Sequence, residues 1–394
     1  MNPTEFTGDS LGRLVLIQEG VHAFIPDPLP MDLPLDRETV TLLSDADRAL
    51  GRLQGVAQSL PNPQLLVRPF LRREAELSSR IEGTYATQEE LVLFDLHRPE
   101  GKARPDVKEV ANYVVALGHG LSRLKEIPVC LRLIRELHLR LLRGVRGDAH
   151  RPGEFRQVQN FIGQRDQPIG KARYVPPPPT AVSQCLDDFE RFLHAESSLP
   201  PLVRLAMIHY QFEAIHPFED GNGRIGRLML PLLLCERKLL THPLLHLSAY
   251  FDRYREEYYD HLLRVSQGGQ WQEWIQFFLR AVSDQAAEAE ERSRALLDLR
   301  QTFQEKIRAK RASALAAKLV DHLFTSPGVT IPFAEDLLKV NFPSASAAVQ
   351  KLVAAGILRE VSGHKRNRIW LAPEILRLLS PSIRKSSDSE THPA

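Results

Sequence analysis

One short segment of the chain, residues 216–227, gathers residue types that together can bind and process a phosphorylated ligand. It reads His-Pro-Phe-Glu-Asp-Gly-Asn-Gly-Arg-Ile-Gly-Arg and leads directly into an apolar stretch, 228–235, that is typical of a buried helix. Glycines let backbone N–H groups approach anionic oxygens without a side-chain clash. A helix that starts there adds unpaired N–H groups and the positive end of its dipole. The segment therefore predicts a site for the triphosphate of a nucleotide.

Four side chains of this segment can carry out the chemistry. His216 belongs to the residue type that titrates near neutrality, so it can take a proton from an attacking hydroxyl. Asp220 offers a hard oxygen ligand, which suits Mg²⁺ on phosphates. Arg224 and Arg227 are three residues apart, so both can project from the first turn of the helix on neighbouring faces.

Other interpretations of the glycines are weaker. Gly221, Gly223 and Gly226 satisfy G-x-G-x-x-G, but that dinucleotide fingerprint follows a β-strand, and the preceding residues 202–215 have helical periodicity. A P-loop is excluded because no Gly-Lys-Ser/Thr is present in the segment. Zinc binding would need further ligands at metal spacing beside His216 and Asp220, and none stands nearby in the sequence.

The segment resembles the signature of the Fic family, H-P-F-x-D/E-G-N-G-R-x-x-R, with every fixed position filled. The resemblance implies a mainly α-helical fold and transfer of AMP from ATP to a hydroxyl of a target protein. It implies that His216 is the general base, that Asp220 holds Mg²⁺ and that Phe218 anchors the loop in the core. It assigns nucleotide binding to Gly221, Asn222, Gly223, Arg224, Ile225, Gly226 and Arg227, with the arginines on the β- and γ-phosphates. The related Doc kinases have lysine where this chain has Gly223, which favours nucleotidyl over phosphoryl transfer.

A second motif upstream resembles the inhibitory motif of the same family, S/T-x-x-x-E-G/N. It runs from Ser78 to Glu82 and Gly83, at the end of a charged helix expected over 69–82. A carboxylate that forms a bidentate pair with an arginine competes with phosphate for the same guanidinium. We therefore expect Glu82 to pair with Arg227 where the γ-phosphate would lie, and Ser78 to orient the Glu82 carboxylate.

The same resemblance assigns two further elements, one to binding of the target protein and one to binding of the nucleotide. Residues 152–179 alternate apolar and polar residues between glycines and prolines, which predicts a β-hairpin. In the family such a flap holds an extended target segment by strand addition, and here it would contain Asn160, Phe161, Ile162 and Gly163. Relatives place a tyrosine pair near the adenine, which points to Tyr258 and Tyr259. Tyrosines at this spacing also serve as core packing, and an asparagine that some relatives have seven residues later is Ser266 here.

The composition of the 394-residue chain indicates a globular protein with more than one domain, which we expect to be cytoplasmic. Its three cysteines are scattered in apolar helices, which indicates buried thiols in a reducing compartment. No signal peptide or membrane-spanning run is visible, and the net charge of +2 is too small to indicate a partner. The expected organisation is an irregular N-terminal arm (1–34), a helical region with the inhibitory helix (35–127), a Fic core (128–282), a connecting helix (283–312), a winged helix (313–374) and a disordered tail (375–394).

The winged-helix prediction rests on the order of elements. Helices are expected over 314–324, 333–340 and 343–356, with a short strand at 329–331 and a hairpin formed by 357–361 and 367–371. As a DNA reader, this module would place residues 344–351 in the major groove and the wing 364–368 on phosphates. Its third helix has only Lys351 as a basic residue, so protein contacts or homodimerisation are equally expected.

The leading hypothesis is a Mg²⁺-ATP-dependent protein adenylyltransferase that modifies Ser, Thr or Tyr hydroxyls and is restrained by Glu82. One alternative keeps the site but reverses the reaction, with Glu82 positioning water to remove AMP from a target. Another is a nucleotide-sensing, DNA-binding regulator, although a sensor has no need for His216 as a base.

Overall fold

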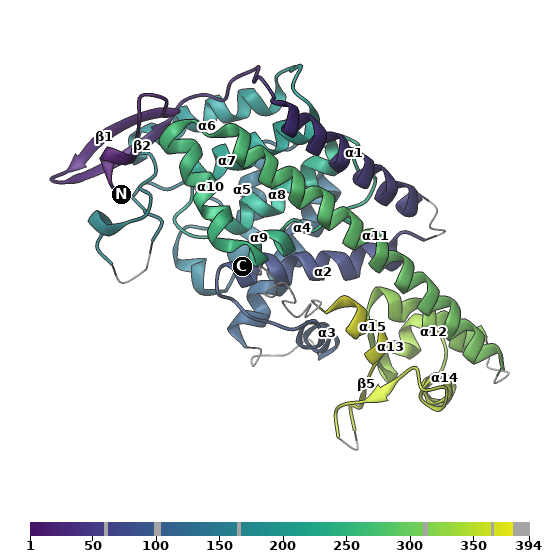
Figure 1. Cartoon of the computed structure of the whole chain (residues 1–394). Coiled ribbons are helices and arrows are strands. Elements are labelled where there is room, and N and C mark those ends of the chain that lie inside the picture. Colours follow the sequence, from purple (N-terminus) through teal and green to yellow (C-terminus); the bar gives the residue numbers. More distant parts are fainter. Residues whose placement is uncertain (59–61, 98–103, 164–166, 310–313, 364–365, 381–394) are drawn as a thin grey trace, which may run out of the picture. The chain divides into compact units, whose positions relative to one another are not determined.

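We analysed a computed structural model of the chain, which describes residues 1–58, 62–97, 104–163, 167–309, 314–363 and 366–380. The chain divides into two compact units that each contain two stretches of sequence (Figure 1). The large unit combines Met1–Ala86 with Arg98–Arg294, and the small unit combines Thr87–His97 with Ala295–Ala394. The predicted fold class is confirmed, since helices dominate both units and the strands form only small antiparallel sheets.

Two nearly all-buried helices, α7 (Pro201–Ile215) and α8 (Asn222–Glu236), form the centre of the large unit. A helix that is apolar on all sides must be surrounded by other elements, and neighbouring helices cover this pair. They are α2 (Gln64–Ile81), α4 (Pro105–Arg123), α5 (Leu131–Leu142), α6 (Pro179–His194), α9 (Ser248–Arg253), α10 (Arg255–Gly268) and the start of α11 (Trp271–Ala309). Helix α1 (Arg37–Gln58) contacts α11 through a hydrogen bond between Thr39 and Gln272. Short 3₁₀ turns occur at η1 (Pro3–Glu5), η2 (Arg146–Ala149) and η3 (Ile169–Lys171). The connection between α7 and α8 is the segment that the sequence predicts as the phosphate site.

The N-terminal region is a β-hairpin, so the prediction of an irregular arm over 1–34 is wrong. Strands β1 (Gly12–Gln18) and β2 (Val21–Pro26) pair in antiparallel register, with Leu14 opposite Phe24. Gly20 supports the connecting turn by adopting a φ of +70°. The Phe24 side chain is fully buried, and its backbone N–H donates to the Val175 carbonyl at 2.8 Å. The prolines after residue 25 had suggested an extended arm, but the hairpin lies before most of them.

The small unit has the element order that the sequence predicts for 313–374. Helices α12 (Ala314–Thr325), α13 (Ile331–Leu338) and α14 (Phe342–Ala354) accompany strands β3 (Gly328–Thr330), β4 (Arg359–Glu360) and β5 (Ile369–Leu371). The strands form an antiparallel sheet in the order β3-β5-β4. Of the predicted wing, residues 364–365 lie outside the described residues. Arg368, expected on phosphate, forms a salt bridge with Glu360.

Three boundaries differ from the predicted organisation. The connecting helix begins at Trp271, inside the predicted Fic core, because α11 continues without a break to Ala309. A further helix, α15 (Pro373–Leu379), occupies the start of the predicted disordered tail and buries Ile375 and Leu379. Residues 381–394 of that tail lie outside the described residues. Helix α3 (Gln88–His97), predicted within the helical region 35–127, belongs to the small unit.

The reason for the placement of α3 is its apolar side. Val92 is completely buried in a cluster with Ile369, Leu371 and Leu376, and Leu93 and Leu96 pack against the same cluster. Gly328 in β3 permits this approach, because a Cβ atom there would lie 2.6 Å from the Val92 side chain. The small unit is therefore completed by a helix that lies far from it in sequence.

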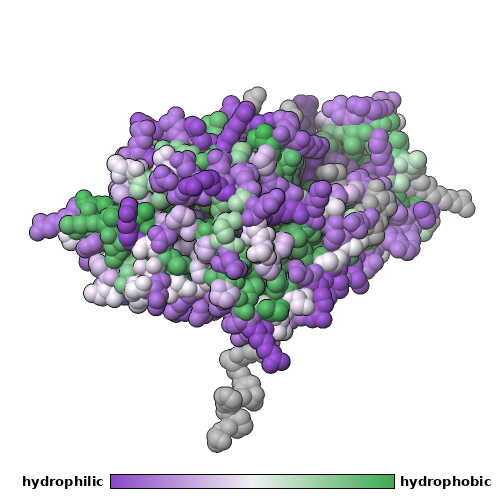
Figure 2. All heavy atoms as spheres, turned by 90° about the horizontal axis from the view of Figure 1, so that it is seen from above, coloured by the Kyte–Doolittle hydropathy of each residue, from purple (hydrophilic) through white to green (hydrophobic). Residues whose placement is uncertain are grey.

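The face of the protein in Figure 2 is largely hydrophilic, with hydrophobic side chains in separate groups. Among the described residues, no helix combines the length and apolar character needed to cross a membrane. All three cysteines are free, as predicted, but only Cys185 is buried, whereas Cys130 and Cys235 are half-buried. Burial raises the pKa of the Cys185 thiol to about 11 and that of Cys235 to about 12, which makes both poor nucleophiles at neutral pH.

Candidate functional site

A cavity of about 1010 Å³ opens in the large unit around the predicted phosphate site. Six fixed positions of the signature line it: His216, Asp220, Gly221, Asn222, Gly223 and Arg227. Residues from three other predicted elements reach the same cavity: Glu82 from the inhibitory motif, Phe161, Ile162 and Gly163 from the flap, and Tyr259 from the tyrosine pair. The structure therefore brings together four predicted elements that are far apart in sequence.

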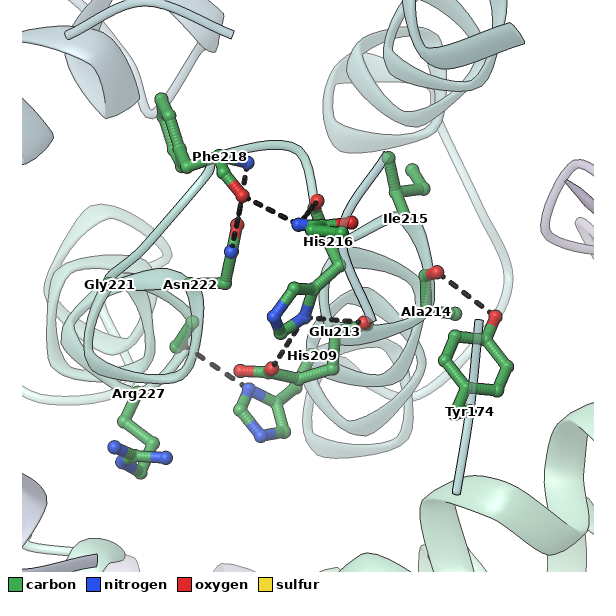
Figure 3. A network of polar contacts seen from close by, with 12 residues as sticks. Tyr174, His209, Glu213, Ala214, Ile215, His216, Phe218, Gly221, Asn222 and Arg227 are labelled. Atoms are coloured by element: carbon green, nitrogen blue, oxygen red, sulfur yellow. Dashed lines mark hydrogen bonds and ion pairs between the residues drawn. The ribbon is translucent and has the colours of Figure 1, made fainter. Parts of the chain in front are cut away.

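His216 ends helix α7 in a left-handed conformation, with φ 49° and ψ 58°. This conformation is unusual for a residue with a side chain and is commonly adopted by glycine at helix ends. It stops the helix and places His216 in the cavity lining, with its imidazole beside Glu213 on the last turn of α7 (Figure 3). Local strain of this kind is common at functional sites.

The imidazole of His216 is oriented as a base. Its Nδ1 lies 3.3 Å from the Glu213 carbonyl oxygen, which can only accept, so Nδ1 carries the hydrogen. That tautomer leaves the lone pair on Nε2. Burial, assisted by the charge of Arg156, lowers the pKa of His216 to about 4, with weaker opposing effects from Glu213, Glu82 and Asp220. His216 is therefore neutral at physiological pH and able to accept a proton.

The loop between His216 and Gly221 is held by reciprocal hydrogen bonds. Asn222 accepts from the Phe218 N–H and donates to the Phe218 carbonyl, both at 2.8 Å. The Phe218 ring is fully buried and stacks on His138 at 3.7 Å between centroids. This confirms the predicted anchoring role of Phe218. Gly221 has a φ of +82° and precedes α8, whose first two residues, Asn222 and Gly223, line the cavity and begin a helix with unpaired N–H groups.

Two buried residues that sequence analysis did not assign to the site fix this loop from outside. His138 donates from Nε2 to the Asp220 carbonyl at 2.9 Å and accepts at Nδ1 from the Gly153 N–H at 2.8 Å. Burial lowers the His138 pKa to about 4, which suits a neutral ring with one donor and one acceptor. Arg156 donates to the His216 carbonyl at 2.9 Å and to the Pro177 carbonyl at 2.6 Å. His138 has no local sequence signal, because its partners are backbone groups of remote residues. Arg156 lies in the predicted flap region 152–179, but its contacts with the His216 loop were not predicted.

Asp220 fits the role of a metal ligand for a nucleotide-bound cation. Its side chain lines the cavity and is about a quarter exposed, with Oδ1 accepting the Gly221 N–H at 2.7 Å. Among the described residues, no group of three His, Cys, Asp or Glu side chains could hold a metal by itself. A single carboxylate on the cavity suits Mg²⁺, which is usually bound by one or two protein carboxylates together with substrate phosphates and water.

Arg227 and Glu82 form the predicted pair across 145 positions of sequence. Arg227 donates from Nη2 to Glu82 Oε1 at 2.7 Å, and its guanidinium is almost completely buried. Burial raises the Glu82 pKa, but the charge and hydrogen bond of Arg227 outweigh it and hold the pKa below its ordinary value. Gly223 makes room for the carboxylate, since a Cβ atom there would lie 2.4 Å from Glu82 Oε1. Glu82 is therefore an ionised carboxylate that lies against Gly223 in the first turn of α8.

Ser78 has a different role from the predicted one. Its hydroxyl accepts from Arg227 Nε at 2.9 Å, and its carbonyl accepts from Arg227 Nη2 at the same distance. Ser78 therefore orients the arginine, not the Glu82 carboxylate. Gly83, with a φ of +77°, ends helix α2 and leaves Glu82 at the helix terminus, where it can reach the cavity.

Arg224 is buried away from the cavity lining, which does not support its predicted contact with phosphate. Its Nη1 lies 3.1 Å from Glu109 Oε2, and its Nη2 lies 3.6 Å from Asp220 Oδ1. Glu109 also accepts from the Thr84 hydroxyl at 3.2 Å, so it links the turn after Glu82 to helix α8. Ile225 and Gly226 are also buried and do not line the cavity. Glu109 was missed because it lies 115 positions from Arg224.

The tyrosine pair is divided between the cavity and the core. Tyr259 lines the cavity, within cation–π distance of Arg173 and Arg255. Tyr258 is 1% exposed, and its ring stacks on Phe251 at 4.5 Å between centroids. Its hydroxyl donates to His209 Nε2 at 2.8 Å. The structure therefore does not support a direct contact of Tyr258 with a nucleotide.

The predicted flap is shorter than a hairpin in the described residues. It consists of one antiparallel bridge between Ile162 and Tyr174, with N–H to carbonyl distances of 2.8 and 3.1 Å. Asn160 donates to the Phe218 carbonyl at 2.8 Å, which ties this segment to the loop after His216. Residues 164–166 lie outside the described residues. The flap residues therefore border the cavity without forming a regular strand.

The strained backbone at His216 allows a test that separates stability from activity. We expect His216→Gly to melt at a higher temperature than His216→Ala, because glycine adopts the left-handed conformation without the cost of about 1 kcal/mol that a Cβ atom adds. Thermal unfolding of both variants, each lacking the imidazole, measures this difference. Equal melting temperatures would contradict a strained backbone at this position.

Fold and site together describe a helical protein with a cavity over the N-terminus of a buried helix and a histidine at the preceding helix end. Residues 40–122 match the Fic/DOC family N-terminal model, and residues 128–234 match the Fic/DOC family model. Both regions are therefore domains of the Fic/DOC family. The resemblance found in the sequence is thereby confirmed.

Similar proteins include two named Protein adenylyltransferase Fic. The one from Drosophila grimshawi is 31% identical and the one from Drosophila melanogaster 30% identical, each over 202 residues and half of this chain. The matched region spans 38% and 37% of those relatives, respectively. Among solved structures, a Fic family protein from Desulfovibrio desulfuricans G20 matches with a TM-score of 0.55, 19% identity and coverage of 86% of this chain and 97% of that one. A Fic domain containing signaling protein from Bacteroides thetaiotaomicron VPI-5482 has a TM-score of 0.50, 21% identity and coverage of 64% and 96%. These structures support the fold.

Proposed function

We propose that the chain is a protein adenylyltransferase that uses Mg²⁺-ATP to modify a Ser, Thr or Tyr hydroxyl of a target protein. The observation that carries this proposal is His216, a neutral imidazole that holds its hydrogen on Nδ1 and borders the same cavity as the N-terminus of α8. A base with a free lone pair beside an anion-binding helix terminus matches what transfer of a phosphorus group to a hydroxyl requires. The adenylyltransferase names of the similar fly proteins support the same reaction.

In the proposed reaction, the target hydroxyl loses its proton to His216 Nε2 while its oxygen attacks the α-phosphorus of ATP. The new P–O bond forms as the bond to pyrophosphate breaks. Backbone N–H groups of Gly221–Gly223 and the Arg227 guanidinium would stabilise the charge on the phosphates. Asp220 would hold Mg²⁺, which supplies charge neutralisation for the departing pyrophosphate. The flap residues Phe161 to Gly163 would hold the target segment beside the base.

The pairing of Glu82 with Arg227 supports restraint of this reaction. The carboxylate takes one donor of the arginine that the β- or γ-phosphate would need, and it lies over Gly223. ATP could then bind only with its phosphates displaced from the in-line arrangement. Because small errors in reacting geometry carry large rate costs, Glu82 would suppress transfer more strongly than binding.

The reaction class can be tested with ATP labelled at either phosphate. We expect label at the α-position, and no label from the γ-position, to appear on protein in a reaction that requires His216. Transfer from the γ-position would identify a kinase and overturn the proposal. Release of AMP from a pre-modified target, without transfer, would favour the reverse reaction with Glu82 positioning water.

The metal assignment has its own test. We expect Asp220→Ala to raise the Mg²⁺ concentration for half-maximal transfer by at least about tenfold, the lower end of what removal of outer-shell metal partners costs. A Mg²⁺ titration of initial rates measures this shift, with Glu219→Ala on the same cavity as the matched control. An unchanged titration for Asp220→Ala would move the metal to other ligands.

A further inference from the structure

Glu213 is a buried carboxylate beside the base that no step of the proposed reaction uses. It lies on α7, three residues before His216, and its Oε2 is 3.9 Å from His216 Nδ1 (Figure 3). This is the nitrogen that carries the hydrogen, on the opposite side of the ring from the lone pair that would accept the proton. The carboxylate is thus placed where it can interact with the ring without occupying the position of the target hydroxyl.

The position of this carboxylate is built into the contact between α7 and α8. The Glu213 side chain is 10% exposed, and its Oε1 has no hydrogen-bond partner among the described residues. Gly226 on α8 provides the space, because a Cβ atom there would lie 2.1 Å from Glu213 Oε1. A buried carboxyl group with an unpaired oxygen is costly for stability. Its retention next to the base suggests a role in the reaction, as perturbed acids often have.

Ionisable groups near Glu213 come from three other helices, and two of these groups are charged. Arg227 on α8 favours its ionised form, whereas Glu82 at the end of α2 opposes it, and Tyr258 on α10 lies nearby as a neutral phenol. Burial is the largest influence and raises the Glu213 pKa to about 7. The carboxyl group therefore titrates in the range where the enzyme would work.

We propose that Glu213 is a positioning residue whose carboxylate stabilises the imidazolium of His216 when Nε2 takes the proton of the target hydroxyl. The proton moves from the hydroxyl oxygen to Nε2, while the Nδ1 hydrogen remains between the ring and Glu213. In a site where burial disfavours the imidazolium, a carboxylate near Nδ1 offsets that cost. The expected effect of Glu213 on the rate of AMP transfer rests on the proposed function. Its expected effect on the His216 ring does not.

Glu213 and His216 share one proton equilibrium, which gives a distinctive pH dependence. Below about pH 7 the pair already holds one proton on the Glu213 carboxyl group, because the pKa of Glu213 is raised to about 7 whereas that of His216 is lowered to about 4. The pair accepts the proton of the target hydroxyl only after that proton has left, so transfer should rise with pH through the pKa of Glu213. Removal of Glu82, a like charge near Glu213, moves this rise to lower pH.

The kinetic test compares Glu213→Gln with Glu213→Asp in the full chain carrying Glu82→Gly, so that activity is measurable. We expect Glu213→Gln to lower kcat on the order of tenfold to a hundredfold with little change in the KM for ATP, and to lose the rise of rate with pH. Glu213→Asp keeps the charge and should recover part of the rate and the pH dependence. If the Gln variant keeps the pH profile of its parent, Glu213 does not act through His216.

A second measurement does not depend on activity. In the chain labelled with ¹³C at histidine Cε1, we expect the His216 resonance, assigned by its loss in His216→Ala, to shift near pH 7 as the neighbouring Glu213 carboxyl group ionises. In Glu213→Gln this response should vanish between about pH 5 and about pH 8. An unchanged His216 titration in Glu213→Gln overturns the proposal even if AMP transfer is absent. Absence of transfer together with the expected titration instead contradicts the proposed function alone.

The integrity of the variant can be checked by its stability. The Glu213 pKa is raised above its ordinary value, so the neutral form contributes stability that is present at low pH and lost as pH rises through about 7. Glu213→Gln, which cannot ionise, should therefore melt at a temperature no lower than that of its parent above neutral pH. A lower melting temperature there would mean that the buried carboxylate stabilises the fold, and it would count against the proposal.

Discussion

Glu82→Gly is expected to increase AMP transfer on the order of a hundredfold, the scale of rate loss that small misplacement of reacting groups produces. The variant removes the carboxylate that lies 2.7 Å from Arg227 Nη2 and frees the guanidinium for phosphate. The change should appear in kcat more than in ATP affinity, because the restrained enzyme can still bind displaced ATP. Initial rates of label transfer from α-labelled ATP measure the increase.

Two companion variants separate the charge of Glu82 from its surroundings. Glu82→Gln keeps the shape of the side chain without its charge, and it should increase the rate of AMP transfer less than Glu82→Gly does. Glu76→Gln on the same helix removes a carboxylate that pairs with Arg80 and should leave the rate unchanged. A Glu82→Gly enzyme no faster than the intact chain would exclude restraint. Because the Glu82 pKa is lowered, its pairing is present above the ordinary carboxyl range, and only acid below that range should relieve it.

His216→Ala is expected to reduce transfer on the order of 10²- to 10⁴-fold, the contribution typical of a general base. ATP binding should change little, since the proposal assigns the phosphate contacts to Gly221–Gly223 and Arg227, which line the cavity and are not altered by this substitution. Measuring AMP transfer and ATP binding separately, in the Glu82→Gly background, distinguishes loss of the base from loss of nucleotide binding. Binding can be followed by calorimetry with ATP and Mg²⁺, and transfer by the same labelled substrate.

The matched control for this variant is His150→Ala, which removes another histidine that lines the cavity. His150 is half-exposed and contacts Glu219, so its loss should leave most of the transfer activity. If His216→Ala retained transfer but lost ATP affinity, His216 would be a binding residue and the base would have to be sought elsewhere. Loss of both in His216→Ala would indicate collapse of the loop.

The signature loop could be predicted from sequence because most of its contacts are local. The Asn222 side chain accepts a hydrogen bond from the backbone of Phe218, four residues earlier, and Gly221 is the residue directly before helix α8. Residue type and spacing therefore already specify the turn. The Glu82–Arg227 pair was also predicted, although only through resemblance to the family. Spacing alone cannot indicate that residues 145 positions apart meet.

The parts that sequence analysis missed depend on tertiary packing. The pairing of Arg224 with Glu109 takes that arginine away from the cavity, and nothing near either residue indicates the other. Tyr258 and Tyr259 are adjacent, but successive residues on a helix face different directions, and only Tyr259 reaches the cavity. Glu213 went unnoticed because its significance comes from burial and from the absence of a side chain at Gly226.

The placement of α3 in the small unit has a consequence for how the chain must be synthesised and divided. During translation, α3 emerges long before β5 and α15, so Val92 stays without its partners until nearly the whole chain has left the ribosome. A fragment that ends after residue 294 would keep α3 but lack the strands that cover it. A stable fragment of the large unit therefore needs residues 87–97 to be removed or replaced by a shorter connection, in addition to removal of the residues after 294. Truncation after residue 294 alone should leave the apolar side of α3 exposed and yield an aggregation-prone product.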